Sequence, residues 1–594
     1  MIAPVRTCFF LAVACIQLSA APAVLSGGDA RAAVTRALPV LSKSAVAFVG
    51  KRTCFSCHHN ALAILTMRMA QTRGVSIDSA ALAEVEAKTF APIHTTTALD
   101  DAIQAVNLND PTPDDSLLLM SAAAAGVPRE VTLEVLARRL ARWQRAGHWV
   151  TSDFRPPHSS SLFTATATAV RAIALYMPPE LTAERDAVFA RARAWLLATK
   201  PVSTEDAAFR LMGLAWCGAS AADLAPARRD LLAMQLASGG WPQLSGYRGD
   251  AYSSGEALYA LFESGTTAAD PAWRRGEKFL LSTQAADGTW HVRTRMLSPA
   301  DVSPRYFTTG FPYEKDEYLS YAGTCWAVMA LLARVPVTLN PPARLPDSAP
   351  AEAPAWLRTA LFGTSGQLES ALANGLDAGA DKLLAAVAHD PEKVKLLLAR
   401  GARPDLGVLT IAAAYRDNSA SVEAVLNAGI PADPPKGTRV KRSPLVLACS
   451  TGDLATVHVL LAHGADPSAS SSGNTPIATA IMFGYPEIVR ALIAAGANTQ
   501  LKEATGVNLV HWATITGHAD VIPVLAEAHV PVNATDENGF TPLMYAATID
   551  FGDTSLVTAL LKAGASRTIK SDDGRTPLQQ AISLHHARLA AALR

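Results

Sequence analysis

Two cysteines and a histidine near the start of the chain form the pattern with the most chemical content. Cys54 and Cys57 stand three positions apart, and His58 follows directly, in the order Cys-Phe-Ser-Cys-His. A thiolate is a strong nucleophile and a soft metal ligand, and a neutral imidazole is the commonest nitrogen ligand for metals. The spacing therefore allows attachment of a metal-containing cofactor, thiol–disulfide exchange, or binding of a metal ion.

The C-x-x-C-H pattern resembles the haem attachment motif of c-type cytochromes. The resemblance implies a covalent haem c, with Cys54 and Cys57 bonded to the porphyrin and His58 as an axial iron ligand. It leaves the sixth ligand open, and a five-coordinate iron is equally allowed. Met67 and Met69 would lie on the same side of the iron as His58, so they are poorly placed. Four residues are better placed along the chain: His94, Met120, His148 and His158.

Two other interpretations of the motif stay open. Cys54 and Cys57 could form a disulfide in a haem-free interaction scaffold. A zinc ion would need four ligands, and His59 and His94 are the available additions.

The chain should contain several folded domains and carry an export signal. Hydrophobic residues make up 49% and charged residues 18% of its 594 residues, which is typical of globular proteins. Lys+Arg and Asp+Glu are 52 each, so the charge gives no argument for nucleic acid as a partner. Residues 1–23 read as a signal peptide, with Arg6, an apolar run and small residues before the cleavage site. We expect a periplasmic or secreted bacterial protein without a transmembrane helix in the mature chain.

Residues 33–334 are predicted to be all-α, with a Gln…Gly…Trp element that recurs. It occurs at Gln144–Trp149, Gln235–Trp241 and Gln284–Trp290. Gln can bridge backbone groups at a helix end, Gly permits the turn, and Trp can clamp adjacent helices. The segment Arg275–Trp290 resembles the QW repeat of squalene and hopene cyclases. The resemblance implies an α/α toroid of helical hairpins, as in the terpenoid-cyclase and prenyltransferase superfamily.

The toroid does not by itself imply an enzyme, because no D-x-D-D acid of the class II cyclases occurs in the sequence. Whether the protein is an enzyme therefore stays open, and an isoprenoid- or glycan-like ligand is an alternative. A cavity in the toroid could be rimmed by polar residues, namely Asp206, Asp250, Tyr252, His291, Arg293, Arg295 and Asp316. The charged run within residues 290–318 is either a solvated loop with ion pairs or part of a binding rim.

The C-terminal third is a repeat array behind a linker. Residues 335–354 are rich in proline, which favours an extended spacer. Beyond them, Gly473, Gly506, Gly539 and Gly574 recur at steps of 33, 33 and 35 residues, and most are followed by Thr-Pro. Residues 355–594 resemble seven or eight ankyrin repeats. The resemblance implies a protein partner on their concave surface.

The sequence thus predicts an all-α protein, an α/α toroid followed by an ankyrin solenoid. Its first function hypothesis is electron transfer or haem-based sensing, with a protein bound by the ankyrin repeats.

Overall fold

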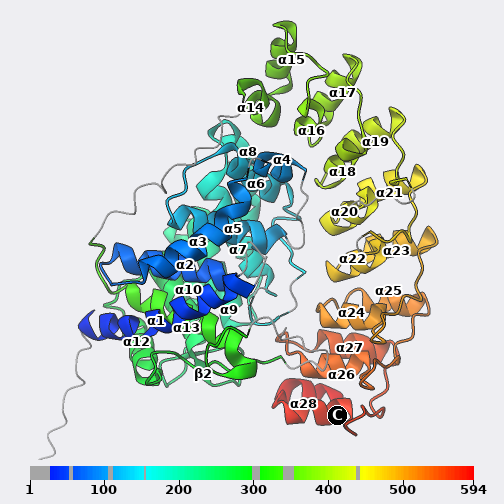
Figure 1. Ribbon diagram of the computed structural model, residues 1–594. Coiled ribbons are helices and arrows are strands. Elements are labelled where there is room, and N and C mark those ends of the chain that lie inside the picture. Colours follow the sequence, from blue (N-terminus) through cyan, green and yellow to red (C-terminus); the bar gives the residue numbers. More distant parts are fainter. Residues whose placement is uncertain are drawn as a thin grey trace, which may run out of the picture.

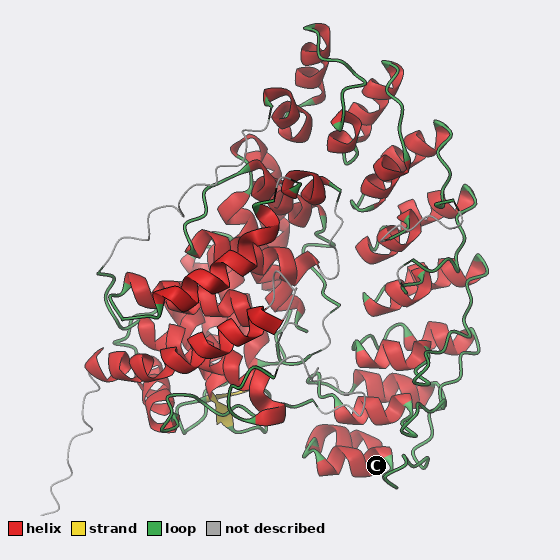
Figure 2. Cartoon of the chain, viewed as in Figure 1, coloured by secondary structure: helices red, strands yellow, loops and turns green. Residues whose placement is uncertain are grey.

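The computed structural model describes residues 27–51, 58–95, 97–104, 111–152, 155–158, 160–296, 308–338, 354–435, 442–471 and 473–594. The predicted signal peptide, Cys54 and Cys57, and residues 339–353 of the predicted linker lie outside this set. The described chain is mostly helical, with 29 α-helices in an N-terminal helical domain and a C-terminal array (Figures 1 and 2). Strands β1 (Trp241–Pro242) and β2 (Gly249–Asp250) form a short antiparallel pair.

Six inner helices of the helical domain contact one another in a closed cycle. Each contacts the next, and the last returns to the first. In order they are α2 (His58–Thr72), α5 (Pro111–Ala124), α7 (Leu162–Tyr176), α9 (Thr204–Trp216), α11 (Ala251–Glu263) and α13 (Glu317–Leu332). In α13 all 16 residues are buried, because this helix is packed against both of its neighbours in the cycle and against an outer helix.

The other helices of this domain lie outside the cycle. They are α1 (Gly27–Lys51), α3 (Ser79–Phe90), α4 (Ala98–Ile103), α6 (Val131–Arg142), α8 (Thr182–Ala198), α10 (Ala221–Ala233) and α12 (Pro271–Thr283), with the 3-10 turns η1 (Ala91–Ile93), η2 (Pro179–Leu181) and η4 (Glu314–Asp316). Helix α1 is long and apolar enough to cross a membrane, yet 56% of its most apolar window is buried in the domain. It contacts α2, α3, α12 and α13, so its apolar side chains pack in the core of the helical domain.

The three Gln…Gly…Trp segments join the ends of outer helices, as predicted. The indole nitrogens of Trp149, Trp241 and Trp290 donate to carbonyls near the ends of α6, α10 and α12, over 2.7–2.8 Å. The glutamine amides donate to the next outer helix: Gln144 to Val188 of α8, Gln235 to Ala272 of α12, and Gln284 to Ala33 of α1. The third segment therefore ties the last outer helix to the first.

Eight helix pairs form the C-terminal array. The first helices of the pairs are α14 (Ala355–Phe362), α16 (Leu383–Val387), α18 (Leu406–Ala413), α20 (Pro444–Thr451), α22 (Pro476–Met482), α24 (Leu509–Ile515), α26 (Pro542–Thr548) and α28 (Pro577–Ser583). The second helices are α15 (Ser365–Ala373), α17 (Pro391–Ala399), α19 (Ser419–Asn427), α21 (Leu454–Ala462), α23 (Pro486–Ala494), α25 (Ile522–Glu527), α27 (Ser555–Lys562) and α29 (Ala587–Leu593). Thr475, Thr541 and Thr576 cap α22, α26 and α28 with their hydroxyl groups, and a proline follows each, as the Thr-Pro pattern predicts.

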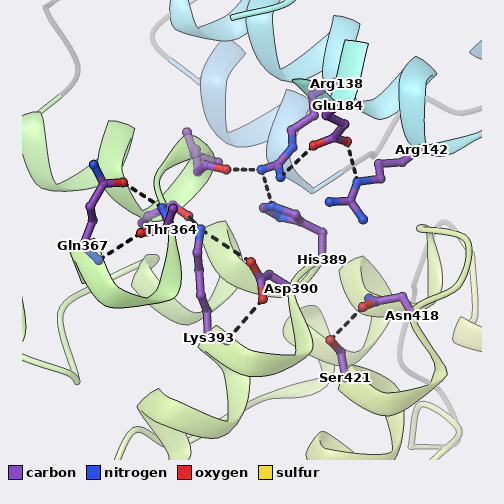
Figure 3. Close-up of polar contacts among 12 residues, drawn as sticks. Arg138, Arg142, Glu184, Thr364, Gln367, His389, Asp390, Lys393, Asn418 and Ser421 are labelled. Carbon is purple, nitrogen blue, oxygen red and sulfur yellow. Dashed lines mark hydrogen bonds and ion pairs between the residues drawn. The ribbon is translucent and has the colours of Figure 1, made fainter. Parts of the chain in front are cut away.

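The array curves beside the helical domain, with helices α16 to α24 of the first set on the near side (Figure 1). At one end, Arg138 of α6 donates to the Leu361 carbonyl and lies 2.6 Å from Nε2 of His389 (Figure 3). In the middle, the indole of Trp143 donates to the Ala414 carbonyl over 3.1 Å. At the other end, the Tyr247 hydroxyl donates to Asp550 over 2.9 Å. The array is therefore docked on its own helical domain along much of its length.

Gly239, in the second Gln…Gly…Trp turn, and Gly246, after it, allow a prediction about stability. Gly239 has φ +91°, and a Cβ there would collide with the backbone carbonyl of Arg275. Gly246 has φ +89°, but a Cβ would meet nothing within 4 Å. Gly246→Ala should cost about 1–2 kcal/mol for the left-handed backbone alone, and Gly239→Ala should cost clearly more, since α12 must also move. Chemical unfolding of both variants measures this, and equal losses would contradict the role of the close approach.

Candidate functional site

A cavity of about 60 Å³ lies inside the cycle of inner helices, and every one of the six helices contributes to its wall. Its wall is mainly apolar and aromatic. The lining residues from the six helices are His58, Leu62, Leu65, Pro113, Leu117, Met120, Thr164, Ala165, Thr168, Phe209, Trp216, Tyr252, Tyr259, Trp326 and Met329. Thr151 and His158, from the connection between α6 and α7, complete it.

The polar end of the cavity is built from the first turns of the inner helices. The Tyr252 hydroxyl donates to Oε2 of Glu205 over 3.3 Å, and Nδ1 of His158 lies 3.0 Å from the same hydroxyl. The Thr164 hydroxyl donates to Oε1 of Glu205 over 2.6 Å. Thr164, Glu205 and Tyr252 are within the first three residues of α7, α9 and α11, so the three helices start at the same end of the cavity.

Local capping explains why these helices begin there. Ser161 caps α7, Ser203 and Asp206 form a capping box on α9, and Asp250 caps α11. Each cap satisfies backbone N–H groups that would otherwise be buried without partners. The caps thereby hold the following polar side chains at fixed places in the wall.

Two buried glutamates give this end its proton chemistry. Burial raises the pKa of Glu205 to about 8, while the hydrogen bond from Thr164 acts in the opposite direction. Burial, and then the neighbouring Glu205, raise the pKa of Glu256 well above its ordinary value. Glu256 is 0% exposed, and neither of its oxygens has a hydrogen-bond partner of good geometry among the described residues. Burial therefore favours the protonated form of Glu205, in which the carboxyl group can donate a proton.

Two histidines stand beside this acid cluster. The rings of His58 and His158 are 3.8 Å apart between centroids and tilted by 58°. Burial, and then the nearby Arg155 and His59, lower the pKa of His58 to about 3, so its imidazole is neutral. His59 is part of the core instead, stacked between Phe48 and Tyr321.

Of the seven predicted rim residues, Tyr252 is in the wall of this cavity, and the other six lie outside its wall. Asp206 accepts from the Ser161 hydroxyl over 2.6 Å, and burial raises the pKa of Asp250 to about 6. His291 and Asp316 form a pair at 2.9 Å. The backbone carbonyl of Arg293 accepts a hydrogen bond from the Gln243 side chain. The Arg295 guanidinium donates to the Asp550 carbonyl of the C-terminal array.

Glu205 and Glu256 are not among the site residues predicted from the sequence. Both carry a weak signal in the sequence. Glu256 stands four positions after Tyr252 and three before Tyr259, so all three share one helix face. Glu205 is the second residue of a helix that is otherwise buried and mostly apolar. Buried carboxylates are rare unless they are paired, and one in a cavity is a candidate for a functional group.

Of the candidate sixth ligands, the structure brings His158 and Met120 to the same cavity as His58. His148 stacks on Trp195 of outer helix α8, and His94 ends the η1 turn. Among the described residues, no group of three or more His, Cys, Asp or Glu side chains is arranged to hold a metal ion.

The residues around His58 fit a haem in ligand chemistry but not in volume. A neutral imidazole is the form that ligates iron, and a second imidazole is next to it. Pockets for ligands of drug size have roughly 300–1,000 Å³, while this cavity has about 60 Å³. The centroids of the His58 and His158 rings are 3.8 Å apart, so this arrangement leaves no room for a porphyrin between them.

The comparisons with known proteins identify the C-terminal array. The family model described as ankyrin repeats (3 copies) matches residues 382–471, 409–503, 477–569 and 510–594. The protein is therefore an ankyrin-repeat protein in its C-terminal part, and such repeats bind proteins in general. The helical domain before the repeats has no family assigned to it.

Curated relatives agree with the ankyrin assignment. YahD of Escherichia coli (strain K12), whose name describes an ankyrin repeat protein, is 28% identical over 212 residues, which are 34% of this chain and 88% of YahD. The E3 ubiquitin-protein ligase KEG of Arabidopsis thaliana is 30% identical over 148 residues, 24% of this chain and 9% of the ligase. Human Rabankyrin-5 is 29% identical over 124 residues, 20% of this chain and 10% of that protein. The chain thus spans a tenth or less of the two larger relatives.

The raised pKa of Glu205 predicts how the free energy of unfolding depends on pH. Between its ordinary pKa of 4.5 and the folded value of about 8, the folded protein binds more protons than the unfolded one. The free energy of unfolding should therefore fall as pH rises from about 5 to 8, by up to about 1.4 kcal/mol per pH unit.

Glu205→Gln stays neutral and should lose this component of the pH dependence. Its stability relative to the natural protein should increase steadily across that window in chemical unfolding experiments. Glu487→Gln, on an exposed side chain of the array, is the control and should follow the natural protein at every pH. A constant offset between Glu205→Gln and the natural protein would show that Glu205 is ionised in the folded state.

Proposed function

We propose that this protein presents a cofactor or ligand site in the cavity of an α/α toroid, and that its ankyrin repeats bind a protein partner. The observation that carries the proposal is the cavity itself. All six inner helices contribute to it, and its polar end includes His58, the residue directly after the Cys54–Cys57 pair. Alternating inner and outer helices with a closed inner cycle support the toroid, as do the three Gln…Gly…Trp ties.

Haem c on Cys54 and Cys57 is the first proposal for the cofactor, in an exported protein that serves electron transfer or sensing. The spacing of the motif and the neutral, half-buried His58 support it. A bound haem would supply an iron for one-electron transfer or for binding a small ligand. In this chain, His58 would hold the iron, and the aromatic wall would keep water away. Admission of a porphyrin between His58 and His158 would require the two rings to separate.

The partner of the array would bind away from the helical domain. The first helices and the turns after them contact that domain through Leu361, His389, Ala414 and Asp550. The loops that connect successive repeats form another, exposed edge, which side chains tie together. Asp433 accepts from the Asp466 backbone over 2.6 Å, and Asn533 accepts from Ser566 over 2.7 Å. We propose this loop edge as the partner surface.

A second candidate is a haem-free site for a small ligand. The observation that favours it is the protonated Glu205 beside an aromatic wall that includes Phe209, Tyr259 and Trp326. A cavity of about 60 Å³ suits only a small molecule, so an isoprenoid- or glycan-like ligand would need an opened form.

The covalent state of Cys54 and Cys57 decides between these proposals. After expression with a haem-c maturation system, intact mass should increase by about 616 Da and a pyridine haemochrome should show a c-type band. Cys57→Ala should lose normal two-bond attachment, while Cys217→Ala, which removes a buried thiol elsewhere, should leave it unchanged. A mass lowered by about 2 Da would instead indicate a Cys54–Cys57 disulfide and a haem-free protein.

A further inference from the structure

A short segment between α12 and α13, the 291–296 strap, contacts α13 and the ankyrin array, and it reaches two further inner helices through Gln243. Toward α13, Nε2 of His291 lies 2.9 Å from Oδ2 of Asp316, and the backbone N–H of Thr294 donates to Oδ1 of the same residue over 2.9 Å. The Val292 N–H donates to the Ser320 hydroxyl over 2.9 Å. Asp316 directly precedes the first residue of α13 and Ser320 is in its first turn, so the strap holds that helix end in place.

The strap reaches α11 through the side chain of Gln243 and α9 through the backbone carbonyl of the same residue. Nε2 of Gln243 donates to the Arg293 carbonyl over 3.1 Å and to Oδ2 of Asp250, the cap of α11, over 3.0 Å. The Gln243 carbonyl accepts from the backbone N–H of Thr204, the first residue of α9, over 3.3 Å. These helix ends carry Tyr252 and Glu205, the hydrogen-bonded pair at the polar end of the cavity.

The other end of the strap is joined to the turn after α26 of the array. The Arg295 guanidinium donates to the Asp550 carbonyl, and the Asp550 N–H donates to the Arg295 carbonyl over 3.4 Å. Met296 pairs with Ile549 in an antiparallel bridge, and the two side chains share a small apolar cluster with Phe551. Arg295 is 5% and Asp550 is 1% exposed, so water does not compete for these contacts.

We propose that the 291–296 strap couples the docking of the ankyrin array to the polar end of the cavity, so that a protein bound to the array alters that site. The inference rests on the proposed function, because it takes the cavity as the functional site. The hydrogen bonds that join Asp550 to Asp250, the cap of α11, run through Arg295, the Arg293 carbonyl and Gln243, and each of them is buried or part-buried. The positive charge of Arg295 also lowers the pKa of Glu205, against the larger effect of burial.

Coupling requires that a change at one site alters the free energy of the other, and the effect is reciprocal. A contact that only holds the array in place would leave the cavity unchanged when it is lost. The chain offers a matched comparison at the opposite end of the array. Arg358 of α14 pairs with Glu134 at 2.6 Å and Glu180 at 2.8 Å. It also ties the array to the helical domain, but neither glutamate is in the cavity wall.

The test compares Arg295→Gln with Arg358→Gln in the full chain. Each removes one arginine that docks the array. The imidazole NMR signals of His58 and His158, assigned by substitution, report on the cavity, and small-angle X-ray scattering reports on the position of the array. We expect Arg295→Gln to shift both imidazole signals, and Arg358→Gln to leave them in place. Arg295→Lys, which keeps the charge, should give a smaller shift than Arg295→Gln.

Two outcomes would overturn the proposal. One is an unchanged pair of imidazole signals in Arg295→Gln, and the other is an equal shift in Arg358→Gln. If Arg295→Gln fails to fold, Arg295→Lys carries the test, and no shift in that variant overturns the coupling. The readout needs neither haem nor a partner, so a failure of the haem proposal in mass spectrometry leaves this experiment decisive.

Discussion

The cavity exists because six helices, far apart in the sequence, close into one cycle of contacts. The closing contact joins α13 to α2, and outside it Gln284 ties the end of α12 to α1. An open row of the same helices would expose the apolar faces of α2 and α13. Closure buries those faces, and it also brings the first turns of α2, α7, α9 and α11 to one end, where polar side chains meet.

That polar end is costly for stability. Glu205 and Glu256 are both buried; burial raises the pKa of each, and the neighbouring Glu205 raises that of Glu256 further. A buried carboxyl group without a full set of partners costs several kcal/mol when it is ionised, so it keeps its proton instead. Hydrophobic residues of similar size would give a more stable core. Strongly shifted groups in a cavity are characteristic of functional sites, which is why the cavity rather than the surface of the domain is the basis of the proposed function.

The ankyrin array is part of the same structural unit as the helical domain. Its docking uses backbone carbonyls of Leu361, Ala414 and Asp550, which accept hydrogen bonds from Arg138, Trp143 and Arg295. At the upper end, His389 is buried against Arg138 and Lys393, and burial with these two cations lowers its pKa far below the ordinary value (Figure 3). An uncharged His389 can therefore lie beside two cations without a further repulsive charge. The outer loop edge stays exposed for a partner.

The sequence by itself determined the local elements of this protein. The 33-residue period predicted the ankyrin repeats, because Thr-Pro caps and glycine turns act within a few residues. The Gln…Gly…Trp segments predicted the ties between outer helices for the same reason. Only the tertiary structure decided which polar residues meet. His58 and His158 are 100 positions apart, and Glu205 and Tyr252 are 47 apart, so no local spacing encodes their contact. The closure of the helices and the docking of the array depend on packing between distant surfaces, and these set both the cavity and the strap that joins it to the repeats.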